Sequence, residues 1–238
     1  MREMLYIAGK ELRSYFVSPV AYIVAAFWLI ATGFFFFVSV TLGREASLRN
    51  VFGVVLILLL LIAPALTMRL LAEESRTGTL ELLLTAPVRD WAVVLGKFLG
   101  ALGLYAVMIG LTLFYPILLV LYNGNPDWGP IWSGYLGLLL LGMLFLSIGL
   151  FASALTSNMM VSAVIAFVLL LLLFVISQLS QNIGAGLGDL LTKISVSDRF
   201  DPFERGVIDL RDIVFYVSAS ALVLFLTIQV LEARRYRA

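Results

Sequence analysis

The sequence predicts an all-α integral membrane protein with six transmembrane helices, and two features support this class. Hydrophobic residues occupy 62% of the 238 positions and charged residues only 13%, whereas about half of a soluble domain is apolar and roughly a quarter is charged. The apolar residues also occur in long runs, and about 18 such residues let a helix cross the hydrocarbon core. The runs lie at positions 20–42, 51–71, 91–122, 134–155, 159–179 and 213–231.

The third run and the short gap after the fourth carry further information. The third run is too long for a simple span at about 1.5 Å of rise per residue. We therefore expect it to begin along the membrane interface or to break near Gly110 or Pro116. Only the polar residues at 156–158 separate the fourth and fifth runs, which predicts an antiparallel helical hairpin.

Residues 1–18 precede the first run and mix charged with apolar side chains. This mixture predicts an amphipathic helix on the membrane surface, which Pro19 ends at the point of membrane entry. A secretory signal peptide is the alternative. It fits less well because the charged region is long and no small-residue cleavage site follows.

The distribution of Lys and Arg predicts how the spans are oriented. With both chain ends on one side, ten of the 16 Lys and Arg residues fall on that side. The other six fall on the opposite side, four of them in the longer segment at 180–212, to which the positive-inside rule gives less weight. We therefore expect both termini and the connection at 72–90 to be cytoplasmic.

The absence of Cys and His limits the chemistry open to this chain. Disulfides, thiolate nucleophiles, zinc sites and His-based acid–base catalysis are excluded, so we expect neither a metal site nor an enzyme. The net charge of +1 gives no reason to expect a nucleic-acid partner. The spans contain almost no carboxylate, which argues against a proton- or ion-coupled carrier. Lys97 lies early in the third run and is expected to extend to the cytoplasmic interface.

The connection at 72–90 has the pattern of two short helices. Gly78 suits a position just past the end of the first helix, and Thr79 has the side chain of an N-cap for the second. Glu81 would lie in the first turn of that second helix, where the helix dipole favours a carboxylate. Its apolar face follows i, i+3, i+4, i+7 spacing and consists of Leu80, Leu83, Leu84 and Pro87. The plainer interpretation is a solvated loop, but an apolar face favours docking on the bilayer or on a cytoplasmic protein.

Small residues recur in the third and fourth runs at the spacing that lets helices approach closely. They are Gly96, Gly100, Gly103, Gly142 and Gly149. We expect these contacts to lie mainly within the chain. A seam between two permease chains is the alternative.

The segment at 180–212 has the features of a helix outside the membrane. Asp201, Pro202 and Glu204 form a helix-start pattern of cap, first-turn proline and following carboxylate. We expect this helix to lie on the outer membrane face. A gate over a pathway, or a contact site for an extracytoplasmic partner, is the alternative. The residues proposed for that role are Phe200, Asp201, Phe203, Gly206 and Asp209.

Motifs at three places resemble ABC-2 type transporter permeases. The connection reads Glu73-Glu74-x-Arg76-x-Gly78-Thr79-Leu80-Glu81-Leu82-Leu83-Leu84-Thr85-x-Pro87, followed by Leu95-Gly96-Lys97-Phe98. The N-terminal stretch Lys10-Glu11-Leu12-Arg13-Ser14-Tyr15-Phe16 resembles the family's cytoplasmic elbow helix, and residues 194–209 resemble its external segment. Within the family, the chain is most similar to the gliding-motility-type permease subunit and to nitrous-oxide-reductase maturation permeases.

The resemblance implies one transmembrane domain over residues 1–238, acting as the permease subunit of an exporter in the inner, cytoplasmic membrane. Two permease chains, identical or different, would form the pathway. Two copies of a separate ATPase subunit would bind ATP and Mg²⁺ and dock beneath them, so no cofactor is expected in this chain. Membrane lipid is an expected partner, and an extracytoplasmic subunit is a further candidate.

The resemblance also implies which residues pass ATPase motion to the spans. Those in the connection are Glu73, Glu74, Arg76, Gly78, Thr79, Leu80, Glu81 and Pro87, and those in the elbow helix are Lys10, Glu11 and Arg13. The chain has no G-x-x-x-x-G-K-[ST] motif, so it is not itself the ATPase.

Two other functions stay open at this point. The chain could be a mechanical membrane subunit that passes ATPase motion to an extracytoplasmic partner and moves no solute. A membrane enzyme fits least well, because His and Cys are absent. The sequence does not indicate a substrate.

Overall fold

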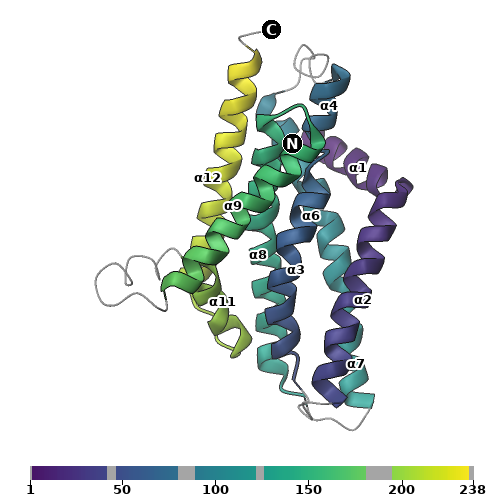
Figure 1. Cartoon of the computed structure of the whole chain (residues 1–238), viewed down its shortest axis with the longest axis vertical. Coiled ribbons are helices and arrows are strands. Elements are labelled where there is room, and N and C mark those ends of the chain that lie inside the picture. Colours follow the sequence, from purple (N-terminus) through teal and green to yellow (C-terminus); the bar gives the residue numbers. More distant parts are fainter. Residues whose placement is uncertain (1, 42–46, 80–88, 122–125, 181–194, 236–238) are drawn as a thin grey trace.

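The computed structural model describes residues 2–41, 47–79, 89–121, 126–180 and 195–235, and every secondary-structure element in these ranges is a helix (Figure 1). The helices are α1 (Arg2–Val17), α2 (Pro19–Thr41), α3 (Arg49–Thr67), α4 (Ala72–Thr77), α6 (Asp90–Thr112), α7 (Phe114–Leu121), α8 (Trp128–Leu155), α9 (Met159–Ser180), α11 (Val196–Glu204) and α12 (Leu210–Arg235).

Six helical segments in the described ranges are long and apolar enough to cross a membrane, which confirms the prediction of six spans. They are α2, α3 with α4, α6 with α7, α8, α9 and α12. Only helices satisfy all their backbone hydrogen bonds within one segment, so a chain this apolar forms helices in a bilayer.

The spans differ in how deeply they are buried. The central spans are α8 and α3, whose most apolar stretches are 78% and 67% buried. By contrast, α2 and α9 are each 17% buried and α12 is 22% buried. The apolar side chains on these three outer helices therefore face the surroundings of the chain, as lipid-facing helices do.

Glycines on α8 let neighbouring helices approach it closely. A Cβ atom at Gly142 would lie 1.9 Å from Cε1 of Tyr105 on α6, and one at Gly149 would lie 2.1 Å from Oγ1 of Thr67 on α3. Both glycines therefore serve packing within the chain, as expected.

The third span breaks within the predicted region. Helix α6 ends at Thr112 and α7 begins at Phe114. Pro116 has no N–H to donate to the carbonyl of Thr112 four residues earlier, which favours a break here. The Tyr135 hydroxyl of α8 instead donates to that carbonyl at 2.8 Å. A side chain of another span thus satisfies the backbone group that the proline leaves free.

Helix α1 lies across one end of the bundle, on the side that also carries α4 and the C-terminal end of α12 (Figure 1). We call this end the α1/α4 end. Pro19 is the first residue of α2, a position where its missing N–H costs nothing. The opposite end, which we call the α11 end, carries α7 and α11.

Two helix starts differ from the sequence prediction. Helix α8 begins at Trp128, six residues before the predicted position 134, and the Asp127 carboxylate caps it by accepting from the Gly129 N–H at 3.1 Å. Helix α11 begins at Val196 and not near Asp201.

The prediction for the start of α11 was wrong because a stronger cap lies upstream. The Ser195 hydroxyl accepts from the Asp198 N–H at 3.1 Å, and Asp198 occupies the first turn. Pro202 consequently falls near the end of the helix, which stops at Glu204. Gly206 then adopts a φ of +88° and turns the chain toward α12.

Candidate functional site

The hydroxyl of Ser153 on α8 forms three hydrogen bonds with the turn between α3 and α4. The backbone N–H groups of Leu71 and Ala72 both donate to Ser153 Oγ at 3.0 Å. Ser153 in turn donates to the Met68 carbonyl at 3.1 Å. These groups at helix ends have no partners within their own helices, so Ser153 fixes where α4 begins.

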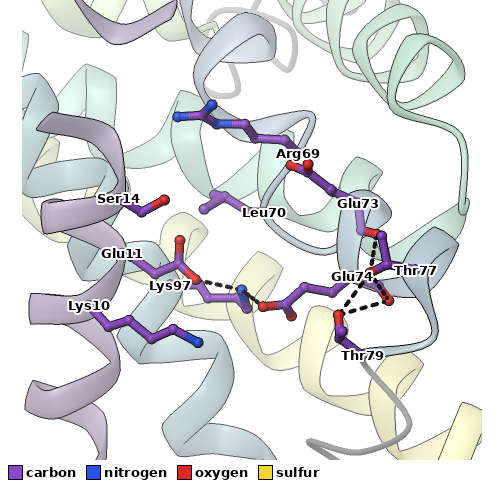
Figure 2. Close-up of a pocket in the computed structure, with 10 residues that line it drawn as sticks. All are labelled: Lys10, Glu11, Ser14, Arg69, Leu70, Glu73, Glu74, Thr77, Thr79 and Lys97. Atoms are coloured by element: carbon purple, nitrogen blue, oxygen red, sulfur yellow. Dashed lines mark hydrogen bonds and ion pairs between the residues drawn. The ribbon is translucent and has the colours of Figure 1, made fainter. Parts of the chain in front are cut away.

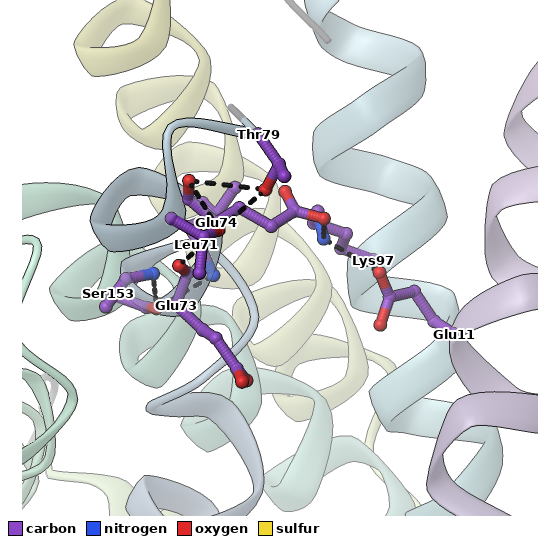
Figure 3. Close-up of polar contacts among 9 residues, drawn as sticks. Glu11, Leu71, Glu73, Glu74, Thr79, Lys97 and Ser153 are labelled. Carbon is purple, nitrogen blue, oxygen red and sulfur yellow. Dashed lines mark hydrogen bonds and ion pairs between the residues drawn. The ribbon is translucent and has the colours of Figure 1, made fainter. Parts of the chain in front are cut away.

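Glu74 on α4 takes part in a buried charge cluster with two other helices. The ammonium of Lys97 on α6 donates to Glu11 Oε1 on α1 and to Glu74 Oε1, each at 2.7 Å (Figures 2 and 3). Lys97 is only 1% exposed. We call these three residues the Lys97 cluster.

Two glycines on α6 bring α1 close enough for this contact. A Cβ atom at Gly100 would lie 2.6 Å from the Cβ of Glu11, and one at Gly96 would lie 2.7 Å from the Cβ of Ile7. The N-terminal helix therefore packs directly on Gly96 and Gly100, and we call this contact surface the α1 seat.

From the sequence, Lys97 is expected to extend to the cytoplasmic interface; the structure shows that its ammonium is buried against Glu11 of α1 and Glu74 of α4. The residues next to Lys97 in the sequence gave no sign of these partners, because Glu11 and Glu74 lie 86 and 23 positions away. A buried ammonium needs such partners, because leaving a charge unpaired in a low-dielectric site is costly.

Helix α1 is also bonded to the end of α3. The Tyr15 hydroxyl donates to the Leu66 carbonyl at 2.6 Å, and burial raises the pKa of Tyr15 above its ordinary value. The Arg69 guanidinium lies 4.8 Å from the centre of the Tyr15 ring and donates to Ser18 Oγ at 3.0 Å. Tyr15 and Arg69 were missed as site residues, because an aromatic residue and an arginine at a membrane surface are ordinary in sequence.

Helix α4 has a further bond to the last span. Arg234 near the end of α12 donates to Ser75 Oγ at 3.0 Å. Consecutive residues of α4 thus contact different spans, since Glu74 binds Lys97 of α6 and Ser75 binds Arg234 of α12.

The end of α4 confirms one predicted backbone feature. Gly78 has a φ of +73°, the left-handed conformation of a residue just past a helix end. The Thr77 hydroxyl donates to the Glu73 carbonyl at 3.0 Å and lies 2.9 Å from the Thr79 hydroxyl. The second helix predicted in this connection, with Leu80, Glu81 and Pro87, lies outside the described residues.

An open cleft of about 350 Å³ separates α1 from α4 (Figure 2). Figure 2 shows that it lies between the two helices whose sequences resemble coupling elements. It brings together Lys10, Glu11, Glu73, Glu74 and Thr79 of the predicted set, whereas Arg13 and Arg76 are exposed outside it. Its lining residues are Lys10, Glu11, Ser14, Arg69, Leu70, Glu73, Glu74, Thr77, Thr79 and Lys97.

At the α11 end, the two predicted aromatic contact residues point into the protein. Phe200 and Phe203 are 1% and 0% exposed. A Cβ atom at Gly137 of α8 would lie 2.8 Å from the Phe203 ring. Asp201 and Asp209 are exposed and Gly206 is half-buried, so these three, and not the phenylalanines, remain at the surface.

Ion pairs fasten α11 to the spans around it. Arg199 of α11 lies 2.9 Å from Asp212 of α12, and Glu204 lies 3.7 Å from Arg49 of α3. Burial, with a smaller contribution from the Asp201 charge, raises the pKa of Glu204 to about 7.

No group of three or more metal-binding side chains occurs among the described residues.

One family model matches this chain. It is described as ABC-2 family transporter protein and covers residues 51–231. This match spans well over half of the 238 residues, and the chain belongs to the ABC-2 transporter family. It is a multi-pass membrane protein of that family. A comparison with curated proteins finds no match.

Proposed function

We propose that this chain is the permease subunit of an ABC-2 exporter and that a separate ATPase subunit drives it. ATP and Mg²⁺ bind to that partner, and the chain itself catalyses no reaction. Family membership supports the transporter class. The motif from Glu73 to Pro87 supports a relationship with the gliding-motility-type and nitrous-oxide-reductase maturation permeases.

The observation that carries this proposal is the set of bonds made by α4. The helix begins at a turn held by Ser153 of α8, and it binds Lys97 of α6 and Arg234 of α12. It leads directly into the connection that ends at Asp90, the first residue of α6. A partner that pushes on this connection would therefore act on three spans at once.

The α1/α4 end is proposed to face the cytoplasm. Ten of the 16 Lys and Arg residues belong to this side of the predicted topology, and positive residues favour the cytoplasmic side. The ATPase would then dock on α1 and on the connection, at residues that include Lys10, Arg13, Arg76 and Gly78. The membrane is proposed to be the inner, cytoplasmic membrane.

Two permease chains are proposed to form the pathway, with one ATPase subunit beneath each. The outward apolar faces of α2, α9 and α12 suit contact with lipid or with the second chain. Whether the second chain is a copy of this one is a question for mass measurement of the purified complex.

The test of this function is ATPase stimulation. The chain is co-purified with a candidate P-loop ATPase sought among its neighbouring genes, and hydrolysis is measured with and without the permease in lipid vesicles. We expect the unaltered chain to stimulate hydrolysis. Glu74→Lys should abolish the stimulation because it places a second cation beside Lys97. Gly78→Pro should abolish it because the fixed negative φ of proline cannot match +73°.

Gly110→Ala is the matched control, because a Cβ atom there has no neighbour within 4 Å. Unchanged stimulation in both coupling variants, with all proteins folded, would refute the docking assignment. Transport of a solute by the reconstituted complex would separate an exporter from the mechanical subunit. The mechanical alternative requires an external contact surface, for which Asp201 and Asp209 are the exposed candidates.

A further inference from the structure

We propose that Lys97 is a positioning residue for coupling, with one permanent carboxylate partner and one releasable partner. Glu11 is the permanent partner and Glu74 the releasable one. The inference deepens the proposed function and rests on it, because it states how motion of α4 reaches the N-terminal helix.

Glu11 is the permanent partner because α1 is closely packed on α6. The N-terminal helix packs over Gly96 and Gly100, which flank Lys97 on α6, and Glu11 sits directly on Gly100. Tyr15 adds a hydrogen bond to the Leu66 carbonyl. Separating Glu11 from Lys97 would require α1 to leave this close-packed seat.

Glu74 is the releasable partner because α4, which carries it, packs on helices other than α1. This helix packs on α8 and α9 and begins at the Ser153 turn, while the open cleft separates it from α1. Glu74 reaches across from α4 to Lys97, and its side chain is 24% exposed, against 2% for Lys97. Rotation of α4 about the Ser153 turn would therefore withdraw Glu74 without disturbing the seat of α1.

The chemistry of the cluster favours such a release. Lys97 has two carboxylate partners at 2.7 Å, so it keeps one counter-charge when Glu74 leaves. An ammonium that had only one carboxylate partner would, on losing it, be left buried without a counter-charge, which is far more costly. In addition, Glu74 Oε2 is buried and has no hydrogen-bond partner among the described residues, and withdrawal into water would give this acceptor one.

The experiment measures two distances in the purified full chain with spin labels. The chain has no cysteine, so introduced cysteines are unique. Gly9→Cys on α1 adds a side chain where nothing lies within 4 Å, and it is paired with Arg76→Cys on α4 or with Arg89→Cys beside the start of α6. Both arginines are exposed.

We expect Glu74→Gln to lengthen and broaden the 9–76 distance and to leave the 9–89 distance unchanged. The matched control is Glu73→Gln, since Glu73 is exposed and forms no ion pair with any described residue, and it should change neither distance. Lys97→Gln should reproduce the effect of Glu74→Gln on the 9–76 distance. The proposal is overturned if Glu74→Gln behaves like the control, or if it changes both distances equally.

A second measurement separates this proposal from the proposed function. With the ATPase bound, the α4 label is moved to Thr77→Cys, because Arg76 belongs to the proposed docking surface and Thr77 is exposed. Addition of ATP should then shift the 9–77 distance and not the 9–89 distance. An ATPase that binds and is stimulated while the 9–77 distance stays fixed would refute the release and preserve the permease assignment. A chain that binds no ATPase but shows the Glu74→Gln effect would preserve the cluster and refute the partner.

Discussion

At the two ends of the bundle, the burial and charge pairing of single residues depend on partners that are distant in sequence. Lys97 has an ordinary setting in the chain, at the start of a span and beside a glycine. In the structure it is buried between carboxylates of two other helices. Glu204 shows the same principle at the α11 end, where burial and then the Asp201 charge raise its pKa and the 3.7 Å contact with Arg49 of α3 only partly offsets the rise.

Removal of the Lys97 ammonium should destabilise the α1/α4 end. Lys97→Met leaves the Glu11 and Glu74 carboxylates facing each other, so we expect a loss of about 2–3 kcal/mol in the free energy of unfolding. The figure is below that for a fully buried pair because both carboxylates are partly exposed. Thermal unfolding in detergent would measure it.

The control for this variant neutralises the whole cluster. Lys97→Met combined with Glu11→Gln and Glu74→Gln removes the repulsion and should recover part of the loss, because neutral replacements of buried ion clusters are often tolerated. A triple variant no more stable than Lys97→Met alone would contradict the electrostatic explanation.

Glu204 should make stability depend on pH. Its pKa in the folded chain is raised from 4.5 to about 7, so the folded state holds a proton that the unfolded state releases between these values. Stability should therefore fall as pH rises from about 4.5 to about 7 and stay low above that, by on the order of 1 kcal/mol after solvent screening.

Unfolding of Glu204→Gln followed from pH 5 to pH 8 tests this sign. The variant should lack the decline and be more stable than the unaltered chain at pH 8. Asp209→Asn is the control, because Asp209 is exposed and is not among the charges that shift the pKa of Glu204. An unaltered chain whose stability rises over this range would contradict the assignment.

At the scale of elements, glycines decide which helices touch. The spans follow from hydrophobicity, but the approach of α1 to α6 and of α8 to its neighbours depends on positions without a Cβ atom. Helix ends follow capping groups, as the start of α11 shows. Ser195 and Asp198 cap that helix upstream of the predicted site, and the earlier start places Phe200 and Phe203 against Gly137 of α8.

Adding one methyl group at the α1 seat should loosen α1. In Gly100→Ala, the new Cβ would lie 2.6 Å from the Cβ of Glu11 and 3.3 Å from the Ala8 carbonyl oxygen. We expect a loss of about 1–3 kcal/mol in stability from this overpacking. Thermal unfolding and proteolysis after α1 would detect it.

The comparison is Gly110→Ala on the same helix, which meets open space. It should be neutral or stabilising by up to about 1 kcal/mol, because alanine favours helices over glycine. Equal effects of the two substitutions would show that α1 does not depend on the Gly100 contact.

At the scale of the whole molecule, two central spans carry the bundle and three outer spans surround them. The buried positions of α3 and α8 hold the core, and α2, α9 and α12 present apolar faces outward. The two ends differ in kind. The α1/α4 end has an open, charged cleft, whereas the α11 end is fastened by ion pairs and two buried phenylalanines.

Single cysteines should report the orientation of the two ends. In intact cells, a membrane-impermeant maleimide should label Asp201→Cys and should not label Arg76→Cys, and permeabilised cells should show labelling of both. Both positions are exposed, and the chain has no cysteine of its own. The reverse pattern would place the α1/α4 end outside and rule out a cytoplasmic ATPase at that surface.

The sequence by itself determined the membrane class, the six spans and the left-handed turn at Gly78, and it offered a break near Gly110 or Pro116 beside an interfacial start for the third run. Each of these depends on local chemistry: long apolar runs need helices in a bilayer, and proline or glycine constrains the backbone at one position. Only the tertiary structure decided that Lys97 joins Glu11 to Glu74, that Ser153 holds the start of α4, and that Phe200 and Phe203 are buried. These features depend on side chains from separate helices meeting in space, and neither helical periodicity nor composition records which faces meet.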